Sequence, residues 1–294
     1  MSSSLVSAPG CGVCGATRSP TRILEVLDQC PECGFVYASQ DDPDALLALY
    51  DDAYFNGEEY PDYLGEEQSL RRSMRGHLAQ MGRSRELRGS LLEVGSAYGF
   101  FLDEARKHFS PVVGIDVCAS PVAHARKLTG LDVRCTDLLR ADFGNQRFDV
   151  ICMWDTIEHV GRPDAVLARV ASLLKPTGSL FLTTGDLGSL NARLRGRRWR
   201  QIHPPSHVNY FTRASMRRVI DRVGMRVTRI ETTAYYHTLY NVLGSLRLRG
   251  GPAGTIASGI LRALGERFFR RVGFWINLRD IMFVEARLAT SEKA

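Results

Sequence analysis

The sequence predicts an α/β protein built around a doubly wound parallel sheet. Between residues 90 and 183, short apolar segments alternate with segments of helical spacing, and a glycine-rich turn follows the first apolar segment. Strands that alternate with helices form parallel sheets, because a crossover helix must carry the chain back to the same edge. With 294 residues, 44% of them hydrophobic and 24% charged, the chain can hold one large globular domain and a small appendage.

The expected elements follow one another regularly along the chain. Apolar segments indicate strands near 90–94, 112–116, 131–135, 148–153 and 179–183, separated by helices near 99–108, 119–129 and 163–174. A further helix near 212–223 precedes strands near 225–232 and 281–288. Upstream of the sheet, residues 66–88 have helical character and residues 43–50 indicate a short helix.

Four of the seven cysteines form two pairs, Cys11-x2-Cys14 and Cys30-x2-Cys33, and a glycine follows each pair. A two-residue gap lets both thiolates reach one ion, so the pattern predicts a tetrahedral zinc ribbon with one strand over Arg22–Leu27. Four cysteine ligands leave no open position, so the zinc would be structural. Redox-active or disulfide-bonded pairs are the alternative and fit a cytoplasmic chain poorly. The other cysteines are expected in the core: Cys118, Cys135 and Cys152.

Charge is distributed unevenly over a chain of net charge +6. Residues 1–60 carry a net charge of −8, residues 61–184 carry +1 and residues 185–294 carry +13. The basic part favours anionic partners, although a solvated arginine-rich surface explains it equally well. The first residues lack the pattern of a secretory signal, and no apolar run approaches the ~20 residues that span a bilayer. A cytoplasmic location is therefore expected.

The turn after the first strand carries the clearest chemical signal. Gly95 and Gly99 permit a sharp bend and close approach to a ligand, and Asp116 ends the next strand, where a carboxylate can accept hydrogen bonds from a ribose. The spacing E-x-G-x-x-x-G, which begins at Glu93, resembles the first motif of class I S-adenosylmethionine-dependent methyltransferases. It differs from the G-x-G-x-x-G of dinucleotide-binding proteins.

Later segments extend this resemblance over roughly residues 10–232 and the final strand. The segments Cys135–Leu139, Arg147–Val160, Leu173–Leu180 and His207–Thr212 are each similar to family motifs. The last of these, with the cysteine pairs, is typical of bacterial small-molecule and sugar methyltransferases with an N-terminal zinc-binding segment. The resemblance implies a Rossmann-like sheet of seven strands, with the last strand antiparallel and a helical insertion at about 233–280 before it.

The same resemblance implies the residues of the site and two cofactors, S-adenosylmethionine and a structural Zn²⁺. The cofactor-binding residues would be Glu93, Gly95, Ser96, Gly99, Asp116, Val117, Asp137, Leu138, Trp154 and Asp155, and the zinc ligands Cys11, Cys14, Cys30 and Cys33. Histidine has a pKa near ~6.5 and suits proton removal. The candidate bases follow strands four and five: His207, His159 and His203.

The chain is expected to divide into a zinc ribbon (1–40), a helical lid or linker (41–89) and a cofactor-binding domain (90–294). A lid could place aromatic residues over the site, or the same residues could pack the ribbon on the core: Tyr54, Tyr60 and Tyr63. Five arginines between residues 193 and 200 surround Trp199 and could grip a phosphate or carboxylate, although a solvated loop is an equal alternative.

These observations favour an enzyme that methylates a small-molecule acceptor, preferably an anionic sugar or natural-product intermediate. Oxygen is the favoured acceptor atom and carbon is possible. An RNA methyltransferase is one alternative, which the basic C-terminal part favours and the acidic ribbon disfavours. A non-catalytic cofactor-binding adapter is another. Residues 233–280 could contact a membrane surface if the acceptor were lipid-linked. The sequence leaves the acceptor and the oligomeric state open.

Overall fold

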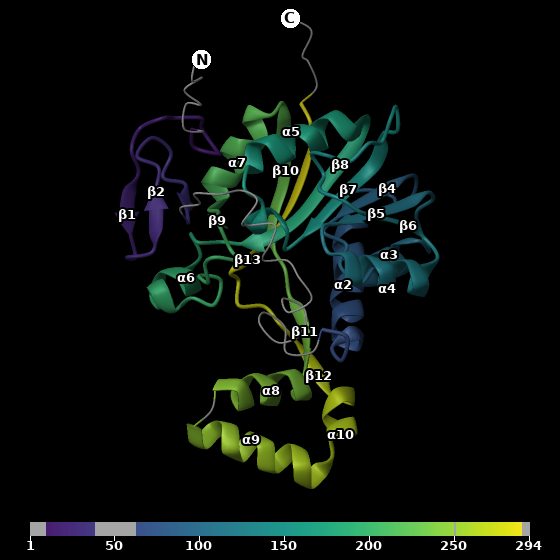
Figure 1. Ribbon diagram of the computed structural model, residues 1–294, viewed down its shortest axis with the longest axis vertical. Coiled ribbons are helices and arrows are strands. Elements are labelled where there is room, and N and C mark those ends of the chain that lie inside the picture. Colours follow the sequence, from purple (N-terminus) through teal and green to yellow (C-terminus); the bar gives the residue numbers. More distant parts are fainter. Residues whose placement is uncertain (1–9, 39–62, 250, 290–294) are drawn as a thin grey trace, which may run out of the picture.

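The computed structural model describes residues 10–38, 63–249 and 251–289. The short helix expected at 43–50 lies outside these ranges, as do Tyr54 and Tyr60. A seven-stranded sheet forms the main body, and a small four-stranded sheet lies beside it (Figure 1). Three helices, joined to the main body by a two-stranded stalk, form an arm below the sheets in this view.

The central sheet has the order β10-β13-β8-β7-β4-β5-β6. Its strands are β4 (Leu91–Val94), β5 (Val112–Asp116), β6 (Asp132–Cys135), β7 (Phe148–Trp154), β8 (Leu174–Gly185), β10 (Met225–Thr232) and β13 (Ile281–Leu288). Strands β4 to β8 are parallel, whereas β13 runs antiparallel to both β8 and β10. The predicted seven-strand α/β fold with an antiparallel last strand is therefore confirmed.

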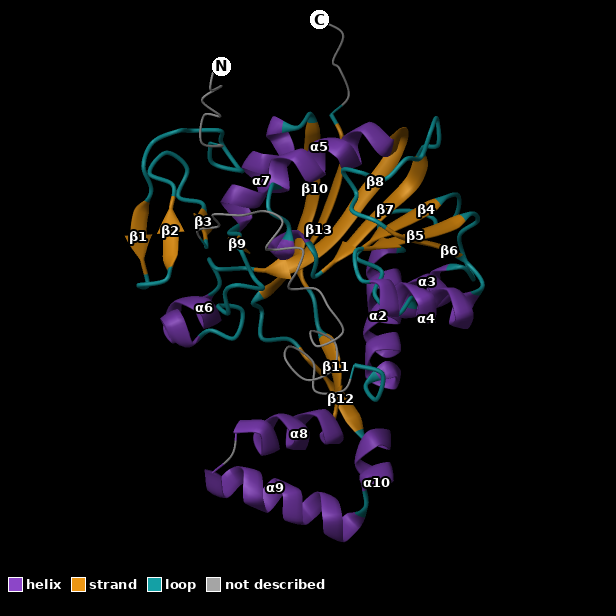
Figure 2. Cartoon of the chain, viewed as in Figure 1, coloured by secondary structure: helices purple, strands orange, loops and turns teal. Residues whose placement is uncertain are grey.

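Helices cover both faces of this sheet (Figure 2). One apolar cluster lies under α2 (Glu67–Met81), α3 (Phe100–Ala105) and α4 (Ala119–Thr129). The other lies under α5 (Pro163–Leu173) and α7 (Arg213–Arg222). Because both faces are covered, β4 and β5 are buried along their whole length, which explains their continuous apolar sequence.

The N-terminal sheet differs from its prediction in one respect. Its strands are β1 (Thr21–Ile23), β2 (Leu27–Gln29), β3 (Val36–Tyr37) and β9 (Asn209–Tyr210). The prediction of a single strand over Arg22–Leu27 was wrong. Leu24 and Glu25 have φ of 47° and 66°, and they turn the chain between β1 and β2. Strand β3 pairs with β9, so the cysteine-rich segment shares a sheet with a loop of the main body.

The insertion before the last strand contains the predicted helices, together with two strands that were not predicted. Strands β11 (Tyr235–Thr238) and β12 (Gly273–Ile276) pair antiparallel as a stalk. Between them lie α8 (Leu239–Arg249), α9 (Gly251–Leu264) and α10 (Glu266–Arg271). The stalk packs on α2, where Trp275 lies against Gly76. No helix within the described ranges is long and apolar enough to cross a membrane.

Candidate functional site

The four N-terminal cysteines converge on one point. Their sulfur atoms all lie within 4.8 Å of one another, with Cys11 Sγ 3.7 Å from Cys33 Sγ and Cys14 Sγ 3.6 Å from Cys30 Sγ. Four sulfurs at the usual zinc–sulfur distance of about 2.3 Å would be about 3.8 Å apart in a tetrahedron. The donor set therefore fits a tetrahedral zinc ion.

Both cysteine pairs have the same backbone geometry. Gly15 N–H donates to Cys11 O at 2.8 Å, and Gly34 N–H donates to Cys30 O at 2.9 Å. These two glycines have φ of +78° and +70°, a conformation that other residues adopt only at a cost. This repetition explains why a glycine follows each pair.

The turn between β4 and α3 is built by two glycines that the fold itself requires. Gly95 and Gly99 both have φ of +78°. A Cβ on Gly95 would lie 2.5 Å from Thr156 Oγ1, and one on Gly99 would lie 2.9 Å from Ala125 Cβ. The space beside each glycine is thus filled by neighbouring protein atoms rather than kept open for a ligand.

Asp116, at the end of β5, holds this turn in place. Its Oδ2 accepts a hydrogen bond from Ala97 N–H at 2.8 Å, and its Oδ1 accepts one from Cys118 N–H at 2.9 Å. A carboxylate has about four acceptor positions, so these backbone donors do not use all of them. Burial raises the pKa of Asp116, and the backbone donors oppose that shift.

Two buried polar groups beside the turn have unpaired atoms. Within the described part of the chain, Glu93 Oε2 and Ser96 Oγ have no hydrogen-bond partner, although both residues are buried. Burial, together with the charge of Asp116, raises the pKa of Glu93 well above its ordinary value. Buried polar atoms are rarely left unpaired. A ligand that donates hydrogen bonds here would satisfy them.

Tyr63, the one tyrosine of the expected lid that the structure describes, lies over the same region. Its ring stacks on Tyr98 and Phe100, with centroid distances of 5.2 and 6.0 Å. Burial raises the pKa of its hydroxyl, as does the negative charge of Glu93 and Asp116. Tyr63 therefore lies close to the carboxylates of Glu93 and Asp116.

The loops after β5 and β6 carry three further predicted residues. Val117 accepts a hydrogen bond from the Cys135 thiol through its carbonyl, at 3.5 Å. Asp137 uses its Oδ1 to accept Leu139 N–H at 2.8 Å, and Leu138 is buried in a core cluster. Cys135 is exposed, so its predicted place in the core was wrong, because it ends an edge strand.

Asp155, directly after β7, connects the central sheet to the arm. Its Oδ1 accepts Thr183 Oγ1–H at 2.9 Å and its Oδ2 accepts the hydroxyl of Tyr235, in β11, at 2.5 Å. Burial raises the pKa of Asp155, and these hydrogen bonds oppose the shift. The sequence did not predict a role for Tyr235, because the stalk was not recognised as a strand that reaches the sheet edge.

Trp154 lies in the core behind this edge. Its ring stacks on His77 of α2 at a centroid distance of 4.6 Å and meets Phe101 edge-on at 5.1 Å. Only 6% of Trp154 is exposed. The ring therefore supports the site from beneath rather than presenting a face to a ligand.

The three candidate bases lie together near Glu158. Glu158, His159 and His207 bring ligand-type atoms within 4.8 Å of one another, and the ring centroids of His203 and His207 are 3.7 Å apart. Glu158 Oε2 is buried and unpaired among the described residues. Burial, with the charge of Asp155, raises the pKa of Glu158 well above its ordinary value.

The three histidines differ in their environments. Nδ1 of His159 lies 2.9 Å from Ser206 O, and Nδ1 of His207 lies 3.0 Å from Gln201 O. Because a carbonyl oxygen only accepts, both Nδ1 atoms carry the hydrogen. Burial lowers the pKa of His159 to about 4 and that of His207 further. His203 is half-buried and its Nδ1 lies 2.8 Å from Ser206 Oγ.

All five arginines near residue 200 are exposed, and the tryptophan between them is buried. Trp199 is 2% exposed and its Nε1–H donates to Asp280 Oδ2 at 2.9 Å. Arg200 pairs with the same aspartate at 2.9 Å, and Arg197 pairs with Glu25 of the N-terminal sheet. Trp199 is therefore not available to stack on a ligand.

The strand order, the glycine turn and the carboxylate at the end of β5 define a class I methyltransferase-type site. The methyltransferase domain family matches residues 67–230, which is more than half of the chain. The chain therefore belongs to the methyltransferase domain family, and the predicted class of enzyme is confirmed at that level.

Curated relatives match over shorter stretches. A ubiquinone biosynthesis O-methyltransferase of Rhodopseudomonas palustris is 34% identical over 99 residues, which cover 32% of this chain and 39% of the relative. A biotin biosynthesis bifunctional protein of Cellvibrio japonicus is 27% identical over 178 residues, which cover 58% of this chain and 34% of the relative. The matches thus span only about a third to two-fifths of these relatives.

Solved structures show the same fold at low sequence identity. Magnesium protoporphyrin IX methyltransferase of Synechocystis, with bound S-adenosylhomocysteine, has a TM-score of 0.52 at 12% identity and covers 83% of this chain and 99% of its own. The [4+2]-cyclase SpnF has a TM-score of 0.51 at 18% identity, and the match covers 76% of this chain and 82% of the cyclase. Since a cyclase shares the fold, the fold alone does not determine the reaction.

Proposed function

We propose that this protein transfers the methyl group of S-adenosylmethionine to a hydroxyl group of a small-molecule acceptor. The observation that carries the proposal is the turn between β4 and α3, where Asp116 retains free acceptor positions beside the unpaired Glu93 Oε2 and Ser96 Oγ. S-adenosylmethionine supplies an activated methyl carbon, and the work of the protein is alignment, which can contribute roughly 7–11 kcal/mol in ideal cases.

The residues around the turn fit this cofactor. Glu93 and Ser96 have unpaired oxygens that can accept from the amino group of the methionine part, and Asp116 can accept from the ribose hydroxyls. The loops that begin at Val117 and Asp137 would flank the adenine. Gly95 and Gly99 shape the turn, and Trp154 would support the site through packing.

The acceptor would lie at the carboxyl ends of β7 and β8. Asp155, Thr183 and Tyr235 form a hydrogen-bonded group there, and the histidine cluster follows β7 and precedes β9. We assign the role of base to His203 ahead of His159 and His207, since burial lowers the pKa of the last two and makes each a weak proton acceptor. Methyl transfer would form the oxygen–carbon bond, break the sulfur–carbon bond and leave the hydroxyl proton on this base.

The four cysteines would hold a structural zinc ion. Their geometry supports this assignment, and four thiolate ligands leave no position for catalysis. Cysteines that bind a metal instead of forming disulfides suit the reducing cytoplasm. We propose that the ribbon occupies residues 1–40, that residues 41–89 link it to the sheet and that the cofactor-binding domain spans residues 90–294.

A sugar or natural-product intermediate with an anionic group is the acceptor class that we favour. The net charge of +13 over residues 185–294 supports an anionic acceptor. An RNA methyltransferase remains the second candidate because of the same charge. Tight RNA binding whose affinity falls steeply with salt would favour that candidate.

Calorimetric titration with S-adenosylhomocysteine tests the cofactor site. The zinc-loaded protein should bind with a Kd of roughly micromolar, and Asp116→Ala should abolish binding. Because that change leaves the N–H groups of Ala97 and Cys118 unpaired, Asp116→Asn provides a milder variant with a weaker effect. Asp132→Asn, at an exposed position of β6, is the matched control and should bind normally.

Methyl uptake from labelled S-adenosylmethionine, measured with nucleotide sugars and other phosphorylated acceptors, then tests the reaction. If the intact, folded protein does not bind S-adenosylhomocysteine at all, the enzyme proposal is wrong. A non-catalytic adapter would then be the better description. Normal binding without methyl uptake by any acceptor would instead contradict only the acceptor class.

A further inference from the structure

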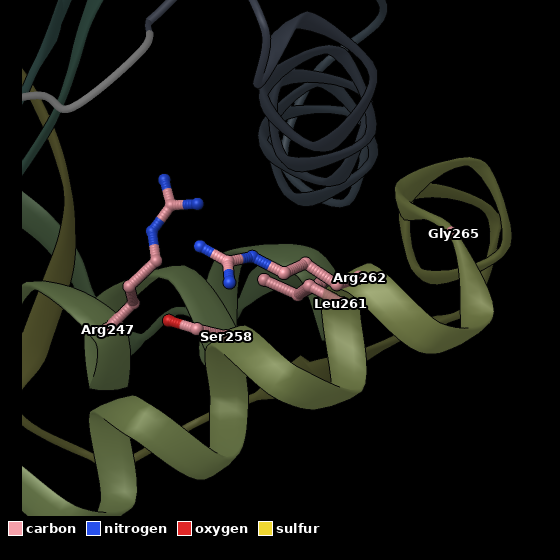
Figure 3. A pocket seen from close by; sticks show the side chains of 5 residues that line it. All are labelled: Arg247, Ser258, Leu261, Arg262 and Gly265. Carbon is pink, nitrogen blue, oxygen red and sulfur yellow. The ribbon is translucent and has the colours of Figure 1, made fainter.

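The arm contains a cavity that lies outside the cofactor site. It has a volume of about 330 Å³ and is lined by Arg247, Ser258, Leu261, Arg262 and Gly265. Figure 3 shows the guanidinium groups of Arg247 and Arg262 extending into the same space, with the Ser258 hydroxyl near them. Arg247 comes from α8 and Arg262 from α9, so the cavity depends on how these two helices pack.

Close packing of α8 on α9 places the two arginines together. Gly254, Ala257 and Leu261 share one face of α9, and all three are buried. A Cβ on Gly254 would lie 3.0 Å from the carbonyl oxygen of Leu246. The glycine therefore lets the two backbones approach closely, which brings Arg247 and Arg262 to one cavity.

The cavity has an excess of positive charge. Residues 239–271 contain six arginines and one acidic residue, Glu266. Among the ion pairs of the described residues, none joins Arg247 or Arg262 to a carboxylate, whereas Arg71, Arg200 and Arg213 each pair with one. Both arginines are exposed, so water screens part of their mutual repulsion, and an anion bound between them would offset the rest.

The chemistry of the lining favours a phosphate group. Guanidinium groups present a planar fork that matches two oxygens of a phosphate, and Ser258 offers a hydroxyl, although its hydrogen now goes to Gly254 O at 2.9 Å. We propose that this cavity binds a phosphate group, carried either by a soluble phosphoester or by the headgroup of an anionic phospholipid.

Calorimetry with pyrophosphate and co-sedimentation with vesicles separate the two sources. The zinc-loaded full chain is titrated with pyrophosphate, and is sedimented with phosphatidylcholine vesicles that contain or lack phosphatidylglycerol. Arg247→Gln and Arg262→Gln should each weaken binding by roughly tenfold or more, since each removes a charge-assisted pair. Arg262→Lys should recover part of the affinity, because it restores the charge without the fork. Arg279→Gln, beyond the stalk, is the control and should bind as the parent does.

The outcomes of these two experiments support or overturn the proposed phosphate site. Pyrophosphate binding that depends on both arginines identifies a soluble phosphoester, and binding only to phosphatidylglycerol vesicles identifies a lipid headgroup. The proposal is overturned if neither probe binds, or if Arg279→Gln weakens binding as much as the cavity variants do. Binding of S-adenosylhomocysteine, measured on the same samples, reports on the cofactor site separately, so failure of one proposal can be told from failure of the other.

Discussion

His77 is a buried histidine with no hydrogen-bond partner among the described residues. It is fully buried in α2, and both ring nitrogens are unpaired against Trp154, Tyr235 and Phe283. Burial lowers its pKa to about 3. Since a buried unpaired polar group costs about 1–3 kcal/mol, His77 destabilises the fold in exchange for its ring packing on Trp154.

Replacement of His77 by leucine should stabilise the protein at acidic pH. The unfolded state binds a proton below about pH 6.5, whereas the folded state binds it only near pH 3, so acidification between these values favours unfolding. His77→Leu removes this contribution. Between about pH 6.5 and pH 4 the free energy of unfolding of the parent should therefore fall by a few kcal/mol more than that of the variant.

Urea unfolding at a series of pH values measures this difference. His108→Leu, which changes a histidine on the surface, is the control variant. If His77→Leu and the parent lose stability in parallel on acidification, His77 does not titrate in the way that its burial implies.

Some of these individual residues could be identified from the sequence, and others could not. Gly95, Gly99 and Asp116 were identifiable because a turn between a strand and a helix demands such residues at fixed spacing. The contacts of the glycines could not be predicted. Tertiary packing brings Thr156 and Ala125 into the space beside them. His77 gave no signal, because a single histidine in a helical segment has the same pattern whether buried or exposed.

At the scale of elements, strand β11 links the arm to the sheet. Its two consecutive tyrosines face different partners. Tyr235 donates to Asp155 at the end of β7, whereas Tyr236 accepts from Arg72 of α2. The alternation of side chains along a strand explains this division. One tyrosine thus contacts the candidate acceptor site and the other fastens the stalk to the body.

Tyr235→Phe should lower the rate of methyl transfer more than it lowers cofactor affinity. The change removes a hydroxyl that orients the Asp155 carboxylate, while the ring that packs on His77 remains. We expect kcat to fall roughly tenfold and the Kd for S-adenosylhomocysteine to change by less than about threefold. Tyr236→Phe removes the neighbouring hydroxyl and should leave kcat within about twofold of the parent. Equal losses in both variants would show that the stalk merely supports the fold.

The long elements were predictable and the short ones were not. Four of the five parallel strands were recognisable because each is a largely buried apolar segment, whereas β6 lies at the edge of the sheet and is only partly buried. The stalk strands have four residues each and depend on pairing with each other across about forty residues of chain. Strand β9 has two residues and is a strand only because β3 lies beside it. Local sequence carries little information about such pairing.

At the scale of the whole molecule, the cysteine cluster and the main sheet form one structure. Apolar residues of the cysteine segment, among them Val13 and Phe35, belong to the core cluster that also contains residues of α5 and α7. Strand β9 follows His207 by two residues, so the N-terminal sheet also fixes the position of the histidine loop.

Removal of zinc should therefore affect both stability and the candidate site. A strong chelator should lower the Tm by several degrees, because ion binding stabilises only the folded state. Cys30→Ser should have the same effect without a chelator. Metal analysis should find one zinc per chain in the parent. Cys135→Ser, which changes an exposed cysteine outside the cluster, should retain the metal and the parent Tm. A parent that contains no zinc and is insensitive to chelation would contradict the assignment.

The pairing of β3 with β9 has a consequence during synthesis on the ribosome. Val36 is made early, but its partner Tyr210 is added about 170 residues later. At 5–20 residues per second, this interval lasts roughly 10–35 seconds. During that time the nascent cysteine segment has an unpaired strand edge and apolar side chains that have no core to enter. A metal ion bound early would hold the segment compact until the rest of the chain emerges, so the ion would act first as protection for an unfinished protein.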